Sequence, residues 1–518
     1  MILQHGASKA GVHMAKVEKC IFEYFASYAA ELSDDLFLFD EDRRYSVAQT
    51  FREAIAIGNH LYDVGVREGS MVALRCTRSM DAYLIFLALE FMGATAVLTD
   101  PHQNVDVFLR ETGLPIQTDF MITNELADQG ISANYNWQVV GHGALEIGYP
   151  ARYEERRFPI GTDLRAPATI VFTSGSTGIS KGSMLCQESL LQYAEDSIVH
   201  DWHHPGDIAI VTLPTQHGFA LCLLIAAFVA RYALFFPRDM AVDYVLDCIE
   251  RYRITRINGV PSYMYTLARA NDEKPRDLHT LRTGFTAGAP VIPEHHCYIE
   301  RVLGMQLHPL YGMSESISIS CTAPTDSPEC RATTVGRFHR NAGCILDSNG
   351  HLLADGQEGE VCVSGPAILL GYYGDEEATR ETIDADGRLH TGDLGYVDEN
   401  GYLHITGRIK NIIIRNGINL SPAKIEAAIR TIPEVENTIV VGIQHELLGE
   451  VPCALVVLRS GCETSAESLK TALHTKLAKN EIPDRIVFAD EIPLNNIGKP
   501  DKKQITELLS NGGKYEPN

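Results

Sequence analysis

The chain carries little positive charge for its length. Its 518 residues include 44 Lys and Arg against 67 Asp and Glu, which gives a net charge of −23. Contacts to nucleic-acid phosphates need clustered Lys and Arg, and so does attraction to anionic lipid. The composition therefore argues against nucleic acid as a partner and against a polybasic membrane anchor.

Paired cysteine motifs are also missing. None of the 12 cysteines has C-x-x-C spacing, and no Cys/His group along the chain has the spacing of a zinc site. A chain of this size does not need disulfide staples. The first 30 residues lack the basic and then apolar pattern of a signal peptide. We expect reduced, mostly buried thiols, no structural zinc and a cytoplasmic protein.

One apolar run approaches the length of a membrane span. Residues 218–236 read GFALCLLIAAFVARYALFF, but Arg231 interrupts the run, and Pro214 and Pro237 bracket it. The pattern favours a buried helix over 218–232 followed by a short strand over 233–236, and not a transmembrane helix.

Helix and strand signals alternate in the first part of the chain, which predicts an α/β fold with parallel strands. Helices are expected over 17–32, over 81–93, and from a Ser46 cap to about residue 61. Strands are expected over 37–40, 71–76, 95–100, 168–173, 208–214 and 253–261. From residue 337 the pattern changes to short strands and turns.

The last 110 residues have the pattern of a separate α+β unit. Helices are predicted over 421–430 and 466–480, with strands over 437–443, 452–458 and 485–489. Residues 411–518 hold 12 basic and 14 acidic residues, so nearly all of the negative charge lies in the rest of the chain. We therefore expect two domains, residues 1–409 and 410–518.

A loop rich in Ser, Thr and Gly follows the strand predicted over 168–173. Residues 173–182 read TSGSTGISKG, which combines hydroxyls, glycine-freed backbone N–H groups and Lys181. These are the groups that a polyphosphate needs. The loop is not a Walker A motif, because Ser180 precedes the lysine and Gly182 follows it. Taken alone, it is an ordinary loop as often as a phosphate site.

Four further motifs follow in order, and each alone is more often structural than functional. They read GAP at 288–290, YGMSE at 311–315, HTGDLG at 390–395 and GRIK at 407–410, and a last lysine stands in NIGKP at 496–500. Tyr311 can stack on a base, Glu315 can bind a hard cation, and Asp393 can accept hydrogen bonds from ribose hydroxyls.

Together, these motifs resemble those of the adenylate-forming superfamily: the acyl-CoA synthetases, or AMP-dependent synthetases and ligases, the adenylation domains and the beetle luciferases. The resemblance covers about residues 20–505. It implies a large N-terminal domain of several subdomains, with mixed sheets, helices and a small β-barrel-like part. A small, mobile α+β C-terminal domain would follow.

The resemblance also implies a role for each motif. It implies that ATP or AMP is bound by Thr173, Ser174, Gly175, Ser176, Thr177, Gly178, Lys181, Gly288, Ala289, Pro290, Tyr311, Gly312, Ser314, Asp393 and Arg408. It implies catalytic roles for Lys499, Glu315, His217 and Arg408, and Mg²⁺ binding by Glu315 and Thr177. Lys410 would be the hinge, and Gly417 would line the coenzyme A tunnel. The acyl pocket would hold His217, Gly218, Phe219, Asn258, Gly259, Thr286, Ala287 and Met313.

The implied reaction is activation of a carboxylic acid with ATP and Mg²⁺, followed by transfer to coenzyme A. Gly218 stands where amino-acid-activating members of the family carry an aspartate, and the stretch after it is apolar, so the resemblance favours a fatty or aryl acid over an amino acid. An enzyme that loads an acyl carrier protein is the alternative, and a non-catalytic binding protein is a third reading. Neither the particular acid nor the oligomeric state follows from the sequence.

Overall fold

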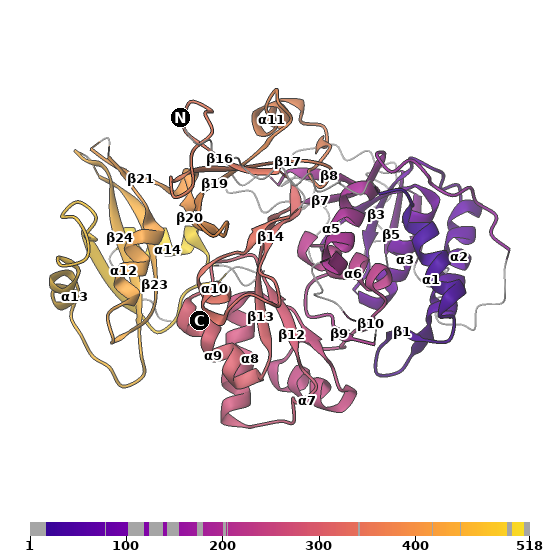
Figure 1. Cartoon of the computed structure of the whole chain (residues 1–518), viewed down its shortest axis with the longest axis horizontal. Coiled ribbons are helices and arrows are strands. Elements are labelled where there is room, and N and C mark those ends of the chain that lie inside the picture. The colour runs from indigo at the N-terminus through magenta and orange to yellow at the C-terminus, as the bar shows by residue number, and fades with distance from the viewer. Residues whose placement is uncertain are drawn as a thin grey trace, which may run out of the picture.

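The structure of the chain is a computed structural model. It describes residues 17–77, 79–101, 119–123, 138–141, 155–172, 180–199, 204, 206–339, 342–416, 418–445, 447–494 and 500–511. A large α/β part occupies most of the molecule, and a smaller α+β part formed by the end of the chain lies beside it (Figure 1). The expected fold class, a large N-terminal and a small C-terminal domain, is therefore confirmed.

Two large sheets form the body of the protein. Among the described residues, the first has nine strands in the order β15 (Arg337–Phe338), β14 (Ser316–Cys321), β13 (Gln306–Met313), β12 (Thr283–Thr286), β11 (Arg256–Ile257), β9 (Ile208–Ile210), β10 (Ala233–Phe235), β1 (Leu36–Phe39) and β2 (Arg44–Ser46). The second has seven, in the order β18 (Gly371–Tyr372), β8 (Gly182–Cys186), β7 (Pro167–Phe172), β4 (Thr95–Leu98), β3 (Met71–Arg75), β5 (Phe120–Thr123) and β6 (Gln138–Gly141).

Helices cover both faces of the nine-stranded sheet. On β1 the side chains alternate, so that Leu38 joins one core cluster and Phe39 the other, as the two-residue period of a strand requires. One core packs against α7 (Val242–Tyr252), α8 (Pro261–Glu273) and α9 (Pro293–Leu303). The larger core is shared with the seven-stranded sheet and holds α1 (Ile21–Glu31), α2 (Val47–Asp63), α3 (Ser79–Met92), α5 (Gln187–Val199) and α6 (Gly218–Ala230).

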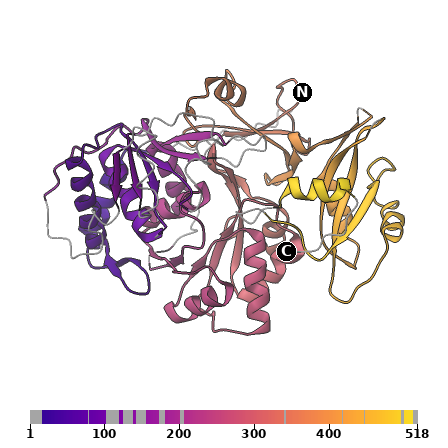
Figure 2. The ribbon, with the colours of Figure 1, turned by 180° about the vertical axis from the view of Figure 1, so that it is seen from behind.

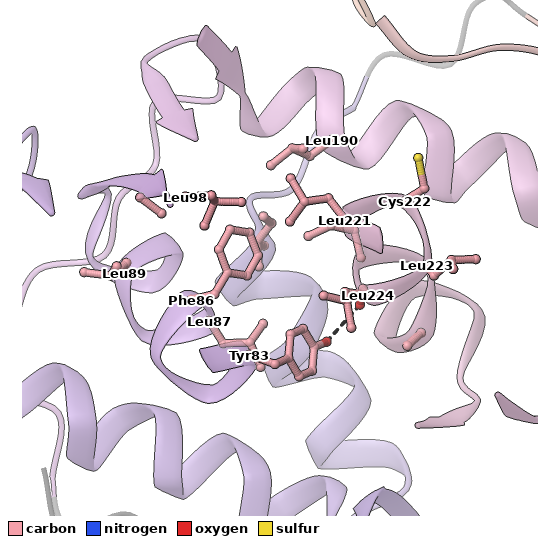
Figure 3. Packing of buried hydrophobic residues seen from close by; sticks show 14 of the residues in the cluster. Tyr83, Phe86, Leu87, Leu89, Leu98, Leu190, Leu221, Cys222, Leu223 and Leu224 are labelled. Atoms are coloured by element: carbon pink, nitrogen blue, oxygen red, sulfur yellow. Dashed lines mark hydrogen bonds between the residues drawn. The ribbon is translucent and has the colours of Figure 1, made fainter. Parts of the chain in front are cut away.

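The apolar run of the sequence is α6, a helix inside this larger core. Figure 3 shows its residues Leu221 and Leu224 facing Phe86 and Tyr83 of α3, and the Tyr83 hydroxyl donates to the Leu224 carbonyl oxygen at 2.8 Å. The helix ends where Arg231 adopts a left-handed conformation with φ of 61°. Among the described residues, no helix is long and apolar enough to span a membrane. The interpretation as a core helix is correct.

Two smaller sheets complete the fold. One has the strand order β16 (Ala342–Leu346), β17 (Gly359–Ser364), β19 (Leu389–Val397) and β20 (Leu403–Arg408). The other belongs to the C-terminal part and has the order β22 (Ile418–Leu420), β21 (Ile413–Arg415), β24 (Gly449–Leu458) and β23 (Val435–His445), with β25 (Arg485–Ala489) paired to β24. The remaining short helices are α10 (Pro328–Thr333), which packs on α9 and β13, and α11 (Glu376–Thr382), the 3₁₀ turn Ile409–Asn411, α12 (Pro422–Arg430), α13 (Ala466–Leu473) and α14 (Lys502–Asn511).

The helix expected over 466–480 is shorter in the structure. It ends at Leu473, and the chain then turns so that Glu481 accepts a hydrogen bond from the Ala478 N–H at 2.8 Å. The same carboxylate pairs with Lys424 of α12 at 2.5 Å. This long-range ion pair is not visible in the local sequence pattern.

An ion pair joins the C-terminal part to α8, which packs beside α9 in the region seen from behind in Figure 2. Arg269 of α8 lies 4.0 Å from Glu436. The ring of His295 on α9 stacks on Tyr265 of α8 with centroids 3.9 Å apart. Several causes together lower the pKa of His295 to about 4: burial is the largest, the Glu294 carboxylate opposes it, and the guanidinium groups of Arg430 and Arg459 add to it.

We expect this histidine to make the protein less stable in acid. A histidine whose pKa falls on folding stabilises the fold above its unfolded pKa of about 6.5, and that contribution disappears as the pH falls towards 4. His295→Phe keeps an aromatic ring on Tyr265 and cannot be protonated, so its melting temperature should fall less between pH 7 and pH 5. His474→Phe, at an exposed histidine, is the control. Equal pH dependence in His295→Phe and wild type would contradict this account.

Candidate active site

The candidate residues gather where parallel strands end. Strands β11, β12 and β13 run parallel, with Arg256 paired to Thr283 and Thr286 to Pro309. In open α/β sheets, ligands bind outside the carboxyl ends of such strands. Many of the predicted site residues lie at the carboxyl ends of these three strands or directly after them. They are Asn258 and Gly259 after β11, Thr286, Ala287, Gly288, Ala289 and Pro290 at the end of β12, and Tyr311, Gly312, Met313 and Ser314 at the end of β13.

Two buried side chains at these ends have polar atoms that find no partner among the described residues. Asn258 and Thr286 are each 1% exposed. The Asn258 Oδ1 accepts from the Phe285 N–H at 2.8 Å, and the Gly259 N–H donates to the Phe285 carbonyl oxygen at 3.0 Å. Among the described residues and their neighbours, Asn258 Nδ2 and Thr286 Oγ1 make no hydrogen bond. An unsatisfied buried polar group costs about 1–3 kcal/mol, so these atoms suit a polar ligand.

A buried carboxylate ties together two strands and a tyrosine. Asp393 on β19 is 3% exposed and accepts a hydrogen bond from the Tyr311 hydroxyl at 2.7 Å. Arg408 pairs with Asp393 across β19 and β20, and its Nε lies 2.6 Å from the carboxylate. Burial and the Asp393 charge raise the pKa of Tyr311 well above its ordinary value. Tyr311 therefore remains a neutral donor at physiological pH.

A second buried carboxylate lies in the turn between β13 and β14. Glu315 is 6% exposed and accepts a hydrogen bond from the Tyr372 hydroxyl at 2.6 Å. The Lys181 Nζ lies 5.0 Å from the centre of the Tyr372 ring. Burial is the largest cause that raises the pKa of Tyr372, and the Glu315 charge is the next largest. Tyr372 thus connects an acidic group suited to a hard cation with a lysine suited to phosphate.

Close packing against Ile317 of β14 brings the start of α6 to this region. His217 is the N-cap residue of α6, and Gly218 follows it. A Cβ on Gly218 would lie 2.8 Å from Ile317 Cγ2, and a Cβ on Gly312 would lie 2.5 Å from the Ile317 carbonyl oxygen. Both positions therefore require glycine. His217 and Phe219 are half-buried at this end of the helix.

Several predicted residues lie outside the described part of the chain. They are Thr173, Ser174, Gly175, Ser176, Thr177, Gly178, Gly417 and Lys499. The strands on either side of the 173–179 loop are described, and β7 pairs with β8 there, Phe172 opposite Gly182. Lys410 is exposed in the 3₁₀ turn Ile409–Asn411, between β20 and β21.

Sequence reasoning missed Tyr372 and Thr391. The Tyr372 hydroxyl joins Glu315 to the neighbourhood of Lys181, and the Thr391 hydroxyl accepts from the Asp393 N–H at 3.1 Å. The only local signal for Tyr372 was an aromatic pair between two glycines, Gly371 to Gly374. Its partners are far along the chain, so no local pattern predicts them.

Comparison with protein families gives one consistent result. Residues 25–373 match the family model described as AMP-binding enzyme, and residues 424–499 match the model of the AMP-binding enzyme C-terminal domain. The first match alone covers more than half of the chain. The two matches also follow the division into a large and a small part.

Individual relatives are similar over nearly the whole chain. The 2-succinylbenzoate–CoA ligase of Bacillus thuringiensis is 29% identical over 475 residues, which are 90% of this chain and 94% of that ligase. The crystal structure of ATP-bound MatB from Rhodopseudomonas palustris has a TM-score of 0.84 and 25% identity, covering 95% of this chain and 99% of that one. The o-succinylbenzoate CoA synthetase of Bacillus subtilis, solved with its acyl-adenylate, has a TM-score of 0.80 and 24% identity over 93% and 97% of the two chains.

We expect Tyr311→Phe to weaken AMP binding about tenfold. The substitution keeps the ring and removes the hydroxyl that donates to Asp393, and a hydrogen bond to a charged group contributes about 1.5–3 kcal/mol when it is fully retained. Tyr396→Phe is the matched control, because Tyr396 lies on the same strand as Asp393 and its ring stacks on His404. Isothermal titration with AMP measures the effect. Equal losses in the two variants would rule out a specific role for the Tyr311 hydroxyl.

Proposed function

Because the chain belongs to the family of AMP-binding enzymes, we propose that it is an acid–thiol ligase that converts a carboxylic acid to its coenzyme A thioester. The observation that carries this proposal is the buried Asp393 carboxylate, held between Tyr311 and Arg408. A carboxylate fixed beside an aromatic ring and a guanidinium suits the ribose, base and phosphate of a nucleotide. The relatives named as CoA ligases support the same activity.

The reaction proceeds in two steps. A carboxylate oxygen attacks the α-phosphorus of ATP, the bond to the β-phosphate oxygen breaks, and pyrophosphate leaves with the acyl-adenylate formed. The coenzyme A thiol then loses its proton, attacks the acyl carbon and expels AMP. The first step makes a good leaving group, because a free carboxylate has only hydroxide or oxide to expel.

The protein has to overcome repulsion between a carboxylate and a polyphosphate. Lys181 beside the 173–179 loop and Lys499 near the C-terminus would supply positive charge in the first step. Glu315, a buried oxygen donor, fits Mg²⁺ by its chemistry, and Thr177 is its proposed companion. The ion would neutralise phosphate charge. Tyr372 orients the Glu315 carboxylate through its hydroxyl.

The pocket residues support an acid that carries a second polar group. Asn258 Nδ2 and Thr286 Oγ1, at the carboxyl ends of β11 and β12, are polar groups with no partner in the part of the chain that the structure describes. A plain alkyl chain would leave both unsatisfied, whereas an aryl or aliphatic acid with a keto or second carboxyl group would not. The name of the Bacillus thuringiensis relative, a 2-succinylbenzoate–CoA ligase, agrees with this class.

Coenzyme A is the proposed acceptor, with Gly417 in its tunnel. Relatives named as CoA ligases favour it over an acyl carrier protein. We also propose that residues 410–518 move as a unit about Lys410, so that Lys499 and Gly417 face the site in turn. Lys410 lies in a short 3₁₀ turn between two sheets, where one residue can change the direction of the chain.

A panel of carboxylic acids tests the proposed function. Pyrophosphate release from Mg·ATP is measured with alkyl, aryl, keto and dicarboxylic acids, with and without coenzyme A. We expect sustained release with coenzyme A, fastest for acids with a second polar group. We expect a loss of about 100-fold or more in Lys499→Ala, because the variant lacks the positive charge proposed to stabilise the transition state.

Lys503→Ala is the matched control, since Lys503 is an exposed lysine four residues away. It should keep the wild-type rate. If each enzyme released only one equivalent of pyrophosphate and coenzyme A did not accelerate the release, coenzyme A would not be the acceptor. No release with any acid class would contradict the ligase activity.

A second experiment tests the hinge. Lys410→Pro fixes φ near the value of a 3₁₀ turn, which the structure already has at this position, so the variant should fold. We expect it to slow one half-reaction about tenfold or more and leave the other nearly unchanged. Acyl-adenylate formation and its consumption by coenzyme A are measured separately in single turnovers, with Lys410→Ala as control. If both steps kept wild-type rates, the hinge assignment would be wrong.

A further inference from the structure

A row of metal-ligating side chains crosses the small four-stranded sheet. The strand register places Cys344 of β16 opposite Cys362 of β17, and Cys362 opposite His390 of β19. Glu360 lies two residues before Cys362 on the same strand. Side chains two residues apart on a strand share a face. The sheet therefore gathers four ligating groups, from three strands, on one side.

Three of these groups point at a common centre. One ligand atom each from Glu360, Cys362 and His390 lies within 4.8 Å of the others. The Cys362 Sγ is 3.6 Å from His390 Nδ1, and the same ring nitrogen is 2.8 Å from Glu360 Oε2. Cys344 lies on the other side of Cys362 from His390, outside this group.

These separations are close to those of a tetrahedral zinc site. Ligands at 2.0–2.3 Å from a tetrahedral zinc ion lie about 3.3–3.8 Å from one another. The sulfur–nitrogen distance already has this value, and the nitrogen–oxygen pair would need to open by about 0.5 Å. The second ring nitrogen, Nε2, lies 3.4 Å from Asp384 Oδ2. A carboxylate on the second nitrogen is the usual arrangement that orients a metal-binding histidine.

An ion pair between His390 and Glu360 accounts for only part of the cluster. It does not explain why a buried thiol lies against the same ring nitrogen, since Cys362 is fully buried. The guanidinium group of Arg388 is paired with Asp384 at 2.8 Å and with Asp386 at 2.5 Å. The other carboxylate oxygen of Glu360 accepts from the Gly392 N–H at 3.0 Å, which leaves Oε2 for a metal.

We propose that Cys362, His390 and Glu360 bind one Zn²⁺ ion, with the fourth position open to solvent. One sulfur, one nitrogen and one oxygen ligand suit this borderline-soft cation. The side chains of His390 and Glu360 are 29% and 20% exposed, so an ion can enter from solvent. The expectation of no structural zinc rested on spacing along the chain, and these ligands are assembled across strands.

The test is metal binding by the full-length protein after treatment with a chelator. A Cys297→Ser background removes the cysteine whose side chain is exposed. Competition with a chromophoric chelator should give one Zn²⁺ per chain. Both Cys362→Ser and His390→Gln should lose about 100-fold or more in affinity, and Asp384→Asn should lose about 10-fold. Bound Co²⁺ should show a thiolate charge-transfer band that Cys362→Ser abolishes.

Cys344→Ser is the matched control. It removes the neighbouring thiol outside the ligand group and should keep wild-type affinity and the cobalt band. Circular dichroism checks that each variant is folded. Wild-type zinc affinity in folded His390→Gln, or a cobalt band that survives in Cys362→Ser, would overturn the proposal. So would the absence of stoichiometric zinc in the wild-type protein, a measurement that needs no variant.

Discussion

The parallel pairing of β9, β11, β12 and β13 is the constraint on which the rest of the site depends. Parallel strands all end at the same edge of the sheet, so loops far apart in sequence emerge beside one another. Both faces of this sheet are buried by helices, which fixes the register of every strand. The position of Asn258, Thr286 and Tyr311 at one edge follows directly from this pairing.

Buried charge is the second feature that organises the molecule. Asp393 and Glu315 are almost inaccessible to solvent, and each accepts a hydrogen bond from a tyrosine hydroxyl. A buried carboxylate is tolerated only when its oxygens have partners. The two tyrosines therefore hold charge in place for a ligand, and they come from different sheets. This arrangement couples the nine-stranded, seven-stranded and four-stranded sheets at one place.

The sequence predicted most elements of the fold because their signals are local. Ser46 caps α2 by accepting from the Gln49 N–H, as its position before an amphipathic run indicated. The apolar run at 218 was correctly interpreted as a core helix because Arg231 interrupts it. The helix beginning at residue 466 was predicted too long, since it ends at Leu473 and the Glu481 carboxylate that follows pairs with the distant Lys424. The Tyr372 contact was missed for the same reason.

The sequence by itself determined the α/β class, the division into a large and a small part and the order of the nucleotide-site motifs. Periodicity, capping residues and glycine-rich turns are properties of short segments, and they can be read along the chain. Only the tertiary structure decided which polar atoms of Asn258 and Thr286 lack partners, and which residues surround His390. The hydrogen-bond partners of buried atoms and the geometry of metal ligands depend on the register between strands that are far apart in sequence. That register is fixed only when the sheets pack.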